Sequence, residues 1–265
     1  MAPQITKWDD LDFVQEDNDS ASEIARTSFG LVVNEIIYYG QLGAPRSEIS
    51  LEQLNAALMP IPSTIYPTWP MSESNLRLAP DDLAENFYIK RPKLETYNWL
   101  VNHGQGLETQ LFKSLVAEAQ VLEELSQHPH PNLIHYYGCR AARGHFTGVV
   151  LEKHPRDLQT HIDEGHKVLD KTAFMGALES AIQHLHDLGF AHNDLCPANV
   201  LVSETGTPVL IDFEGCQKLG TLLQYIRGTE GWIGGEIKDH HTSDTVHDTF
   251  ALGKIRAWLE SVKGY

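Results

Sequence analysis

The sequence predicts an α+β protein with two lobes, with mainly β-structure before about residue 152 and mainly helix after it. Short strand-like segments bounded by glycine and proline dominate the first part of the chain. A long apolar stripe at helical spacing follows in the second part. The chain has 265 residues, of which 42% are hydrophobic and 21% charged, and this is sufficient for either one large domain or two small lobes.

Residues 1–55 are expected to form an acidic, partly ordered N-terminal extension. Residues 8–25 carry seven acidic side chains and no lysine or arginine, which predicts a solvated arm. Residues 29–39 are typical of a strand. Residues 50–53 have the Ser-x-x-Gln pattern of a capping box, which predicts a short helix that must end before Pro60.

Residues 56–152 are expected to form the small lobe. Four prolines between residues 60 and 70 mark an extended linker or a lobe edge. Residues 86–90 alternate between polar and apolar and then meet a proline, which predicts an edge strand. Residues 107–125 place apolar side chains at helical spacing, and residues 146–151 are strand-like.

Residues 153–265 are expected to form the mainly helical lobe. Its clearest element is an amphipathic helix over residues 173–188, with one apolar stripe formed by Phe174, Ala177, Leu178, Ala181, Ile182, Leu185 and Leu188. His184 and His186 on this helix are two positions apart, so they face different sides and are poorly placed to share a metal ion.

The most informative segment is the run Ala-His-Asn-Asp-Leu-Cys-Pro-Ala-Asn at residues 191–199, followed by Ile-Asp-Phe-Glu-Gly at 211–215. It places Asp194 and Asn199 five positions apart on one loop, and Asp212 directly after a β-branched run. Phosphoryl transfer needs these groups: one carboxylate that faces the attacking hydroxyl, and an amide with a second carboxylate that hold magnesium against the phosphates.

These residues resemble the catalytic loop and the Asp-Phe-Gly turn of the eukaryotic-type protein kinase domain. The resemblance covers about residues 60–256 and is closest to divergent kinase-like proteins of filamentous fungi. It implies a two-lobed protein-kinase-like fold with a small, mainly β N-lobe and a mainly helical C-lobe, which is shortened because the chain ends soon after the helix expected near residue 246. The positions that match the family's motifs, in chain order, are Lys90, Glu118, Asp194, Asn199, Asp212, Glu236 and Asp248.

The resemblance implies a catalytic set with magnesium as a cofactor. Asp194 corresponds to the catalytic base, while Asn199 and Asp212 correspond to the residues that bind Mg²⁺. Asp248 corresponds to the buried helix carboxylate that braces the catalytic loop.

The resemblance also implies an ATP site. Lys90 corresponds to the strand lysine that contacts the nucleotide phosphates, and Glu118 to the helix carboxylate that orients this lysine. Glu152 and His154 fall where the family's hinge receives the adenine. The implied partners are therefore a nucleotide and a protein substrate whose identity the residues do not reveal.

The chain departs from the family pattern at four places. It has no glycine between Gly43 and Gly104, so no glycine-rich loop precedes the lysine strand. Cys196 stands where protein kinases carry a lysine that meets the γ-phosphate, and Asn193 replaces the arginine that pairs with an activation-loop phosphate. Glu214 replaces the turn glycine, and it either adds a third metal-site oxygen or is merely tolerated in the turn.

Three functions remain open at this point. The first is an ATP-dependent protein kinase directed at serine and threonine, with weak activity, and the second is a pseudokinase that serves as a binding or scaffold module. The third is a small-molecule phosphotransferase similar to aminoglycoside or choline kinases, which share the pattern of residues 192–214. Residues 228–236 resemble the end of an activation segment, and residues 128–132 resemble the family's passage from helix to strand, so both favour the first function over the third.

Composition limits the kinds of partner that the protein can bind and the cellular compartment in which we expect it. A net charge of −16 argues against binding to nucleic acid or to acidic membranes, because both need basic patches. Three cysteines without a C-x-x-C spacing predict free thiols in a reducing compartment. The N-terminus has no apolar core of a signal peptide, and no apolar stretch approaches 18 residues. We therefore expect a cytoplasmic or nuclear protein that is not secreted and has no transmembrane segment.

Overall fold

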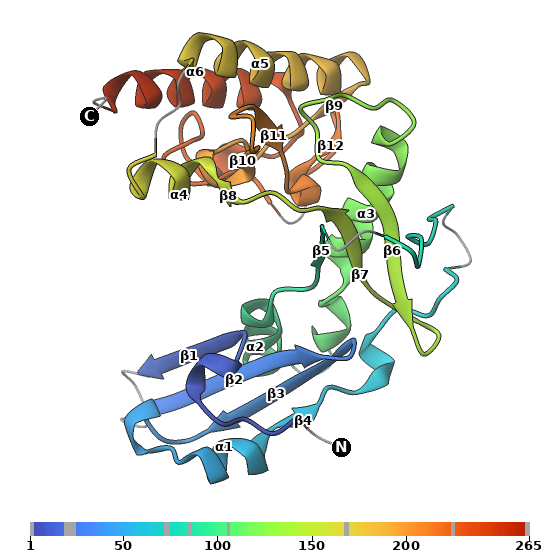
Figure 1. Cartoon of the computed structure of the whole chain (residues 1–265), viewed down its shortest axis with the longest axis vertical. Helices are drawn as coiled ribbons and strands as arrows, with labels where there is room; N and C mark the ends of the chain where they lie inside the picture. Colours follow the sequence, from blue (N-terminus) through green and yellow to red (C-terminus); the bar gives the residue numbers. More distant parts are fainter. Residues whose placement is uncertain are drawn as a thin grey trace. The chain divides into compact units, whose positions relative to one another are not determined.

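The computed structural model describes residues 3–18, 25–71, 75–83, 86–104, 107–166, 170–223 and 226–262. The chain divides into two compact units (Figure 1). Unit 1 comprises Met1–Ser72, Arg91–Lys113 and Ala141–Gly148, and unit 2 comprises Glu73–Lys90, Ser114–Arg140 and Val149–Tyr265. Each unit is assembled from separate pieces of the chain.

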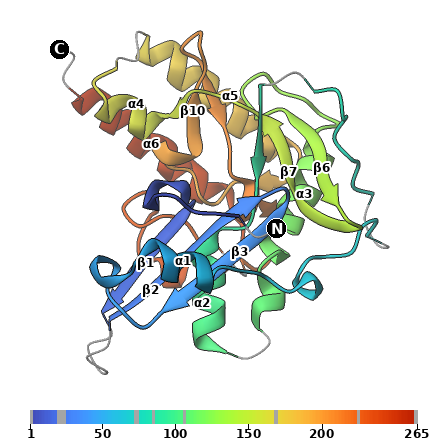
Figure 2. The ribbon, with the colours of Figure 1, turned by 60° about the horizontal axis from the view of Figure 1, so that its bottom comes forward.

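Unit 1 is an antiparallel sheet with a helix on each face (Figure 2). Its strands lie in the order β1 (Phe13–Asn18), β2 (Ala25–Val33), β3 (Ile36–Leu42) and β4 (Met59–Pro60). On one face, α1 (Leu51–Ala57) closes a buried core formed by Ile5, Phe29, Leu31, Tyr38, Ile49, Leu54 and Leu58. On the other face, Tyr97 of α2 (Leu94–His103) packs edge-on against Tyr39, with 4.9 Å between the ring centroids.

The N-terminal region contains more regular structure than the sequence predicts. Part of the expected acidic arm is strand β1, since Phe13 is buried and the strand pairs with β2; residues 19–24 lie outside the described part. The single strand expected over 29–39 is instead a hairpin of β2 and β3, because Asn34 and Glu35 both adopt positive φ (49° and 64°) and reverse the chain. The predicted capping box is confirmed, since the Ser50 hydroxyl accepts a hydrogen bond from the Gln53 amide at the start of α1.

The first part of unit 2 contains most of a three-stranded sheet and one helix, while the end of β6 and the start of β7, within Ala141–Gly148, are assigned to unit 1. The strand order is β5 (Phe87–Lys90), β7 (His145–Glu152) and β6 (Tyr136–Ala142), so β5 is an edge strand as predicted. Lys90 pairs with Val149 across β5 and β7. The helix expected over 107–125 is α3 (Lys113–Leu125), and residues Leu107–Gln110 form a 3-10 turn before it.

The second part of unit 2 is mainly helical and confirms the predicted α+β class. It contains α4 (Leu158–Asp163), α5 (Lys171–Asp187) and α6 (Thr245–Ser261), and α5 lies beside α6 (Figure 1). The short strands are β8 (Arg156–Asp157), β9 (Phe190–Ala191), β10 (Val200–Val202), β11 (Pro208–Leu210) and β12 (Gln217–Lys218). The predicted stripe of α5 is confirmed, because its members Phe174, Leu178, Ala181, Ile182 and Leu185 are all buried.

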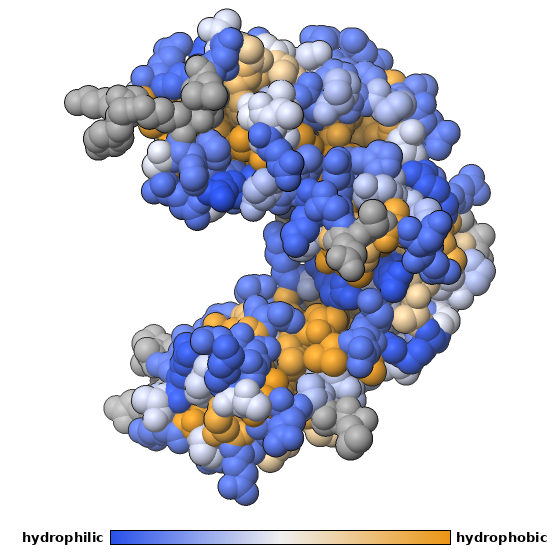
Figure 3. Space-filling model, viewed as in Figure 1, coloured by the Kyte–Doolittle hydropathy of each residue, from blue (hydrophilic) through white to orange (hydrophobic). Residues whose placement is uncertain are grey.

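The surface is largely hydrophilic on the face that Figure 3 shows, which agrees with the net charge of −16. Among the described residues, no helix has both the length and the apolar character needed to cross a lipid bilayer. Cys139, Cys196 and Cys216 are all free and buried, as the spacing predicts.

Candidate active site

Lys90 and Glu118 meet inside unit 2. Lys90 is the last residue of β5, and Glu118 projects from α3. The ammonium of Lys90 lies 2.8 Å and 2.7 Å from the two carboxylate oxygens of Glu118. Only 1% of Glu118 is exposed, so this ion pair is shielded from water.

The turn that carries Asp212 closes on the same ammonium. Asp212 adopts a positive φ of 62°, which turns its carboxylate to within 2.8 Å of Lys90 Nζ. The backbone amide of Phe213 donates a hydrogen bond of 2.9 Å to Oε1 of Glu118. The strand lysine, the helix carboxylate and the Asp-Phe-Glu turn are therefore joined in one buried network.

Glu214 also faces this network. Its carboxylate lies 3.2 Å from Lys90 Nζ, and 12% of its side chain is exposed. An oxygen of Glu214 lies within 4.8 Å of oxygens of Asp212 and Glu118, which is the position that a third metal-site oxygen requires. The side-chain direction was not predictable, because it depends on the backbone of the turn.

Three carboxylates therefore surround one ammonium. Burial raises the pKa of Glu118 to about 7, and the charges of Asp212 and Glu214 act in the same direction, although Lys90 opposes them. Burial alone lowers the pKa of Lys90, but the three carboxylates outweigh it and hold this pKa above its usual value. Single oxygens of Glu118, Asp212 and Glu214 lie within 4.8 Å of one another, so a hard divalent cation would find several oxygen ligands and an excess of negative charge here.

Asp194 is held between two polar side chains. Its Oδ1 accepts a 2.6 Å hydrogen bond from the Thr229 hydroxyl. The Asn199 amide donates to the Asp194 carbonyl at 2.8 Å and to Oδ2 at 3.3 Å. Burial raises the pKa of Asp194 and so favours proton acceptance, while the hydrogen bond from Thr229 acts in the opposite direction. Thr229 was not singled out from the sequence, and only its place in the activation-segment likeness could have pointed to it.

Asp248 supports the loop from below. Its side chain is fully buried and accepts hydrogen bonds from the backbone amides of His192 and Asn193, both at 2.8 Å. The ring of His186 adds a contact of 2.9 Å. By contrast, His184 contacts the backbone carbonyl of His128, so these two histidines do diverge, as their spacing predicts.

Asn193 connects three parts of unit 2. It adopts a positive φ of 63°, and its side-chain amide donates to the carbonyls of Ala191 and Gly215 and to the hydroxyl of Ser243. Its side-chain oxygen lies 3.1 Å from Nδ1 of His247 on α6. A neutral, fully bonded side chain therefore occupies the position where the family resemblance implies an arginine that awaits a phosphate.

The segment that carries Thr229 is attached to α6. The Trp232 ring meets Trp258 edge-on at 5.8 Å, and the Lys254 ammonium donates to the carbonyl of Gly231. Glu236, which matches a motif residue, takes no part in this attachment: it is exposed and pairs with Lys238 at 2.7 Å. Contacts with α6 thus hold the segment beside the Asp194 loop.

The other predicted residues have more peripheral places. Glu152 donates its backbone amide to the carbonyl of His135, and its carboxylate lies 3.4 Å from Nε2 of His154. Cys196 is buried, and burial raises the pKa of its thiol, so no charge stands at that position. In the described part of the chain, β5 pairs only with β7, and no glycine-rich hairpin lies along its free edge.

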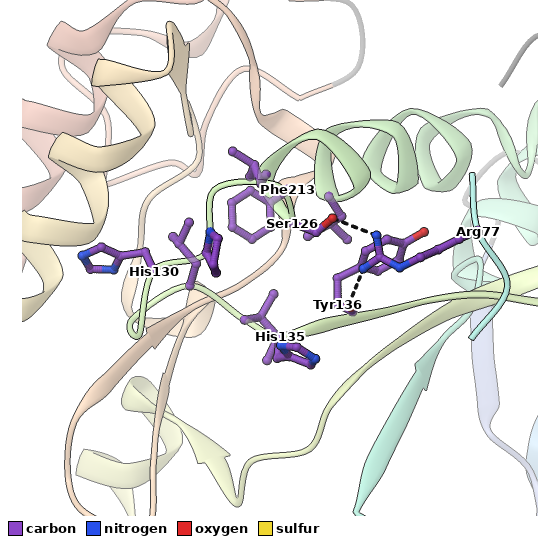
Figure 4. A pocket seen from close by; sticks show the side chains of 11 residues that line it. Arg77, Ser126, His130, His135, Tyr136 and Phe213 are labelled. Atoms are coloured by element: carbon purple, nitrogen blue, oxygen red, sulfur yellow. Dashed lines mark hydrogen bonds between the residues drawn. The ribbon is translucent and has the colours of Figure 1, made fainter. Parts of the chain in front are cut away.

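A small cavity of about 100 Å³ lies beside Phe213 (Figure 4). Phe213 reaches it from the Asp-Phe-Glu turn, and its other walls come from α3, from the loop after it, from β6 and from Arg77. The apolar lining residues are Leu122, Leu125, Leu133, Ile134, Tyr136 and Phe213. The cavity thus separates the helix that carries Glu118 from the start of β6.

Comparisons with known proteins agree with this geometry. The protein kinase domain model matches residues 100–261, more than half of the chain. The human serine/threonine-protein kinase/endoribonuclease IRE2 is 33% identical over 134 residues, which are 45% of this chain and 14% of that protein. The IRE1 protein of Hypocrea jecorina is 31% identical over 48% of this chain and 12% of its own length, and the serine/threonine-protein kinase shk2 of Schizosaccharomyces pombe is 29% identical over 47% and 22%.

The matched region is therefore less than a quarter of each of these relatives. Among solved structures, the PK-1 kinase of Cydia pomonella granulovirus shares 19% identity, with a TM-score of 0.47 and 56% coverage of both chains. The family model spans Glu118, the Asp194 loop, the Asp212 turn and Asp248, which are the residues that the structure brings together. On this match, the chain belongs to the protein kinase domain family.

Proposed function

We propose that the chain transfers a phosphoryl group from Mg-ATP to a serine or threonine hydroxyl of a protein. The observation that carries the proposal is the position of the Lys90 ammonium, bonded at 2.8 Å or less to both Glu118 and Asp212. This arrangement sets a phosphate-binding cation beside a metal-binding carboxylate, and phosphoryl transfer depends chiefly on such positioning and electrostatic stabilisation.

Asp194 is the proposed base. The attacking hydroxyl would donate its proton to this carboxylate, whose pKa burial raises. Thr229 and Asn199 hold the carboxylate in one orientation from opposite ends. Asp248 fixes the backbone of the loop, so the base does not have to be ordered during the reaction.

The residues present fit magnesium and a nucleotide. Asp212 and Asn199 are the proposed metal-binding residues, and Glu214 offers a further oxygen beside Asp212. Bound magnesium would neutralise charge on the phosphates, which is its usual contribution to this chemistry. Lys90 would hold the phosphates, and Glu152 with His154 would border the adenine.

The first test is nucleotide binding. Mg-ATP at about ten times its Kd should stabilise unit 2 by about 1.4 kcal/mol and raise its melting temperature by roughly 3–6 °C. Lys90→Ala should abolish this rise, whereas Lys238→Ala, which removes an exposed lysine, should keep it. No shift in the wild type at millimolar Mg-ATP would contradict the proposal.

The second test is catalysis. Asp194→Asn should eliminate phosphate transfer to a generic protein substrate or to the chain itself while it leaves nucleotide binding intact. Asp187→Asn, at an exposed position at the end of α5, is the matched control and should retain activity. Transfer that survives Asp194→Asn would rule out the proposed base.

A binding module without catalysis is the second candidate, and two observations favour it. The outer edge of β5 has no strand partner in the described residues, and Cys196 supplies no charge for the transferred phosphate. This second candidate function predicts that the fully folded wild-type chain shows no phosphate transfer. A measured turnover that Asp194→Asn abolishes decides against it.

A further inference from the structure

The position of α3 determines whether Glu118 can reach Lys90. The ion pair and the amide of Phe213 hold the middle of the helix from one side. The C-terminal end of α3 borders the cavity of about 100 Å³, which also borders Tyr136 at the start of β6, so a side chain that bridges this space would hold the helix end against the strand. Arg77 makes that contact.

Arg77 spans the gap between α3 and β6 (Figure 4). Its guanidinium lies 2.5 Å from Glu123 Oε1 on α3 and donates to the Ser126 hydroxyl at 2.8 Å, just beyond the helix. On the other side it donates to the carbonyl of Tyr136 at 2.9 Å and lies over the Tyr136 ring at 4.8 Å. The planar fork of arginine thus bonds the helix and the strand at the same time.

The segment that carries Arg77 is built to lie along the outer edge of β6. Cys139 donates its amide to the Arg77 carbonyl at 2.8 Å, and Ala79 donates to the Cys139 carbonyl at 3.0 Å. Gly138 makes this approach feasible: it has a φ of 142°, and a Cβ there would lie 2.5 Å from the Ala79 amide nitrogen. Arg77 is therefore fixed by its backbone as well as by its side chain.

We propose that Arg77 is a positioning residue that locks α3 to β6 and so keeps Glu118 within reach of Lys90 and Phe213. This inference rests on the proposed function for its relevance to nucleotide binding, but its geometry stands without it. It also gives a role to residues 77–79, which come from the part of the chain where the family resemblance calls for a glycine-rich hairpin.

Hydrogen–deuterium exchange tests the lock without any nucleotide. Arg77→Met should raise the exchange rate of α3 and of the Phe213 amide by at least about tenfold, because that amide is protected by Glu118. Glu123→Gln should raise both rates by a smaller factor, and Glu124→Gln should raise neither. Glu124 is the matched control because it is the next residue on α3 and, among the described residues, its carboxylate pairs with exposed Lys218.

The amide of His192 is the internal reference. It donates to Asp248 and should stay protected in every variant that folds. Gly138→Ala is an independent way to break the contact between Arg77 and α3, since it displaces the segment that carries Arg77 without changing the Arg77 side chain itself. If Arg77→Met fails to fold, Glu123→Gln and Gly138→Ala decide the matter.

Faster exchange at Phe213 in Arg77→Met, with His192 unchanged, supports the lock. Exchange that rises only at the last turn of α3, with Phe213 still protected, overturns it, because Arg77 would then be purely structural. An equal rise in Glu124→Gln overturns it too. A chain that binds no nucleotide but shows the expected exchange would refute the proposed function and leave the lock standing.

Discussion

Replacing Asp248 with asparagine removes the negative charge that braces the catalytic loop while it preserves the size of the side chain. In the wild type, Oδ2 accepts from the His192 amide at 2.8 Å and from the His186 ring at 2.9 Å, and Oδ1 accepts from the Asn193 amide at 2.8 Å. An asparagine has only one accepting atom. Whichever way it turns, at least one buried backbone amide faces an NH₂ group instead of an oxygen.

The magnitude follows from these contacts. A hydrogen bond to a charged group contributes about 1.5–3 kcal/mol, and a neutral one about 0.5–1.5 kcal/mol. Asp248→Asn loses one such bond completely and weakens the remaining ones, so we expect it to lower the free energy of unfolding of unit 2 by about 3 kcal/mol. That is a large share of a typical total of about 5–15 kcal/mol.

Urea unfolding followed by circular dichroism measures this loss, and the midpoint should fall by about 1 M or more. Hydrogen exchange at His192 and Asn193 provides the local readout and should accelerate. Asp244→Asn is the control, because Asp244 caps the same helix α6 and asparagine is an equally good N-cap. A loss below about 1 kcal/mol in Asp248→Asn, or an equal loss in Asp244→Asn, would refute the reasoning.

Three further predictions concern the network around the site. Glu118 has a pKa near 7 in the folded state against an ordinary value of 4.5, so the folded chain binds more protons than the unfolded chain between these pH values. The free energy of unfolding should therefore fall as the pH rises from about 4.5 to about 7. Glu118→Gln should flatten this slope when urea unfolding is measured across that range. Gly228→Ala should lower the free energy of unfolding by about 2 kcal/mol and reduce any phosphate transfer at least tenfold. The reason is that the new Cβ would lie 2.1 Å from the Ile233 side chain, at a φ of 107° that alanine rarely adopts. An unchanged thermal unfolding temperature would contradict this prediction. Trp258→Ala should speed hydrogen exchange over residues 228–234, since it removes the ring contact with Trp232, and unaltered exchange there would show that the contact is dispensable.

Local patterns were read reliably from the sequence where one short segment contains the whole cause. The capping box of α1 lies within four residues, and the buried stripe of α5 follows from helical periodicity. The same logic failed at residues 29–39, because the turn at Asn34 and Glu35 needs positive φ at two residues without glycine. Nothing in the apolar pattern marks such a turn.

By itself, the sequence determined the family and the set of residues that meet at the site. Lys90, Glu118, Asp212 and Asp248 could be named because their order and spacing follow a family pattern. Their mutual geometry was implied by the resemblance.

Only the tertiary structure decided which other residues join them. Thr229 bonds to Asp194 across 35 positions, Glu214 turns toward Lys90, and Arg77 joins Glu123 across 46 positions. The same holds for unit 1, whose sheet is completed by a helix from residues 91–113. Contacts of this kind depend on how distant segments pack and on the backbone angles at their ends, and neither quantity is encoded in the spacing of residues along one segment.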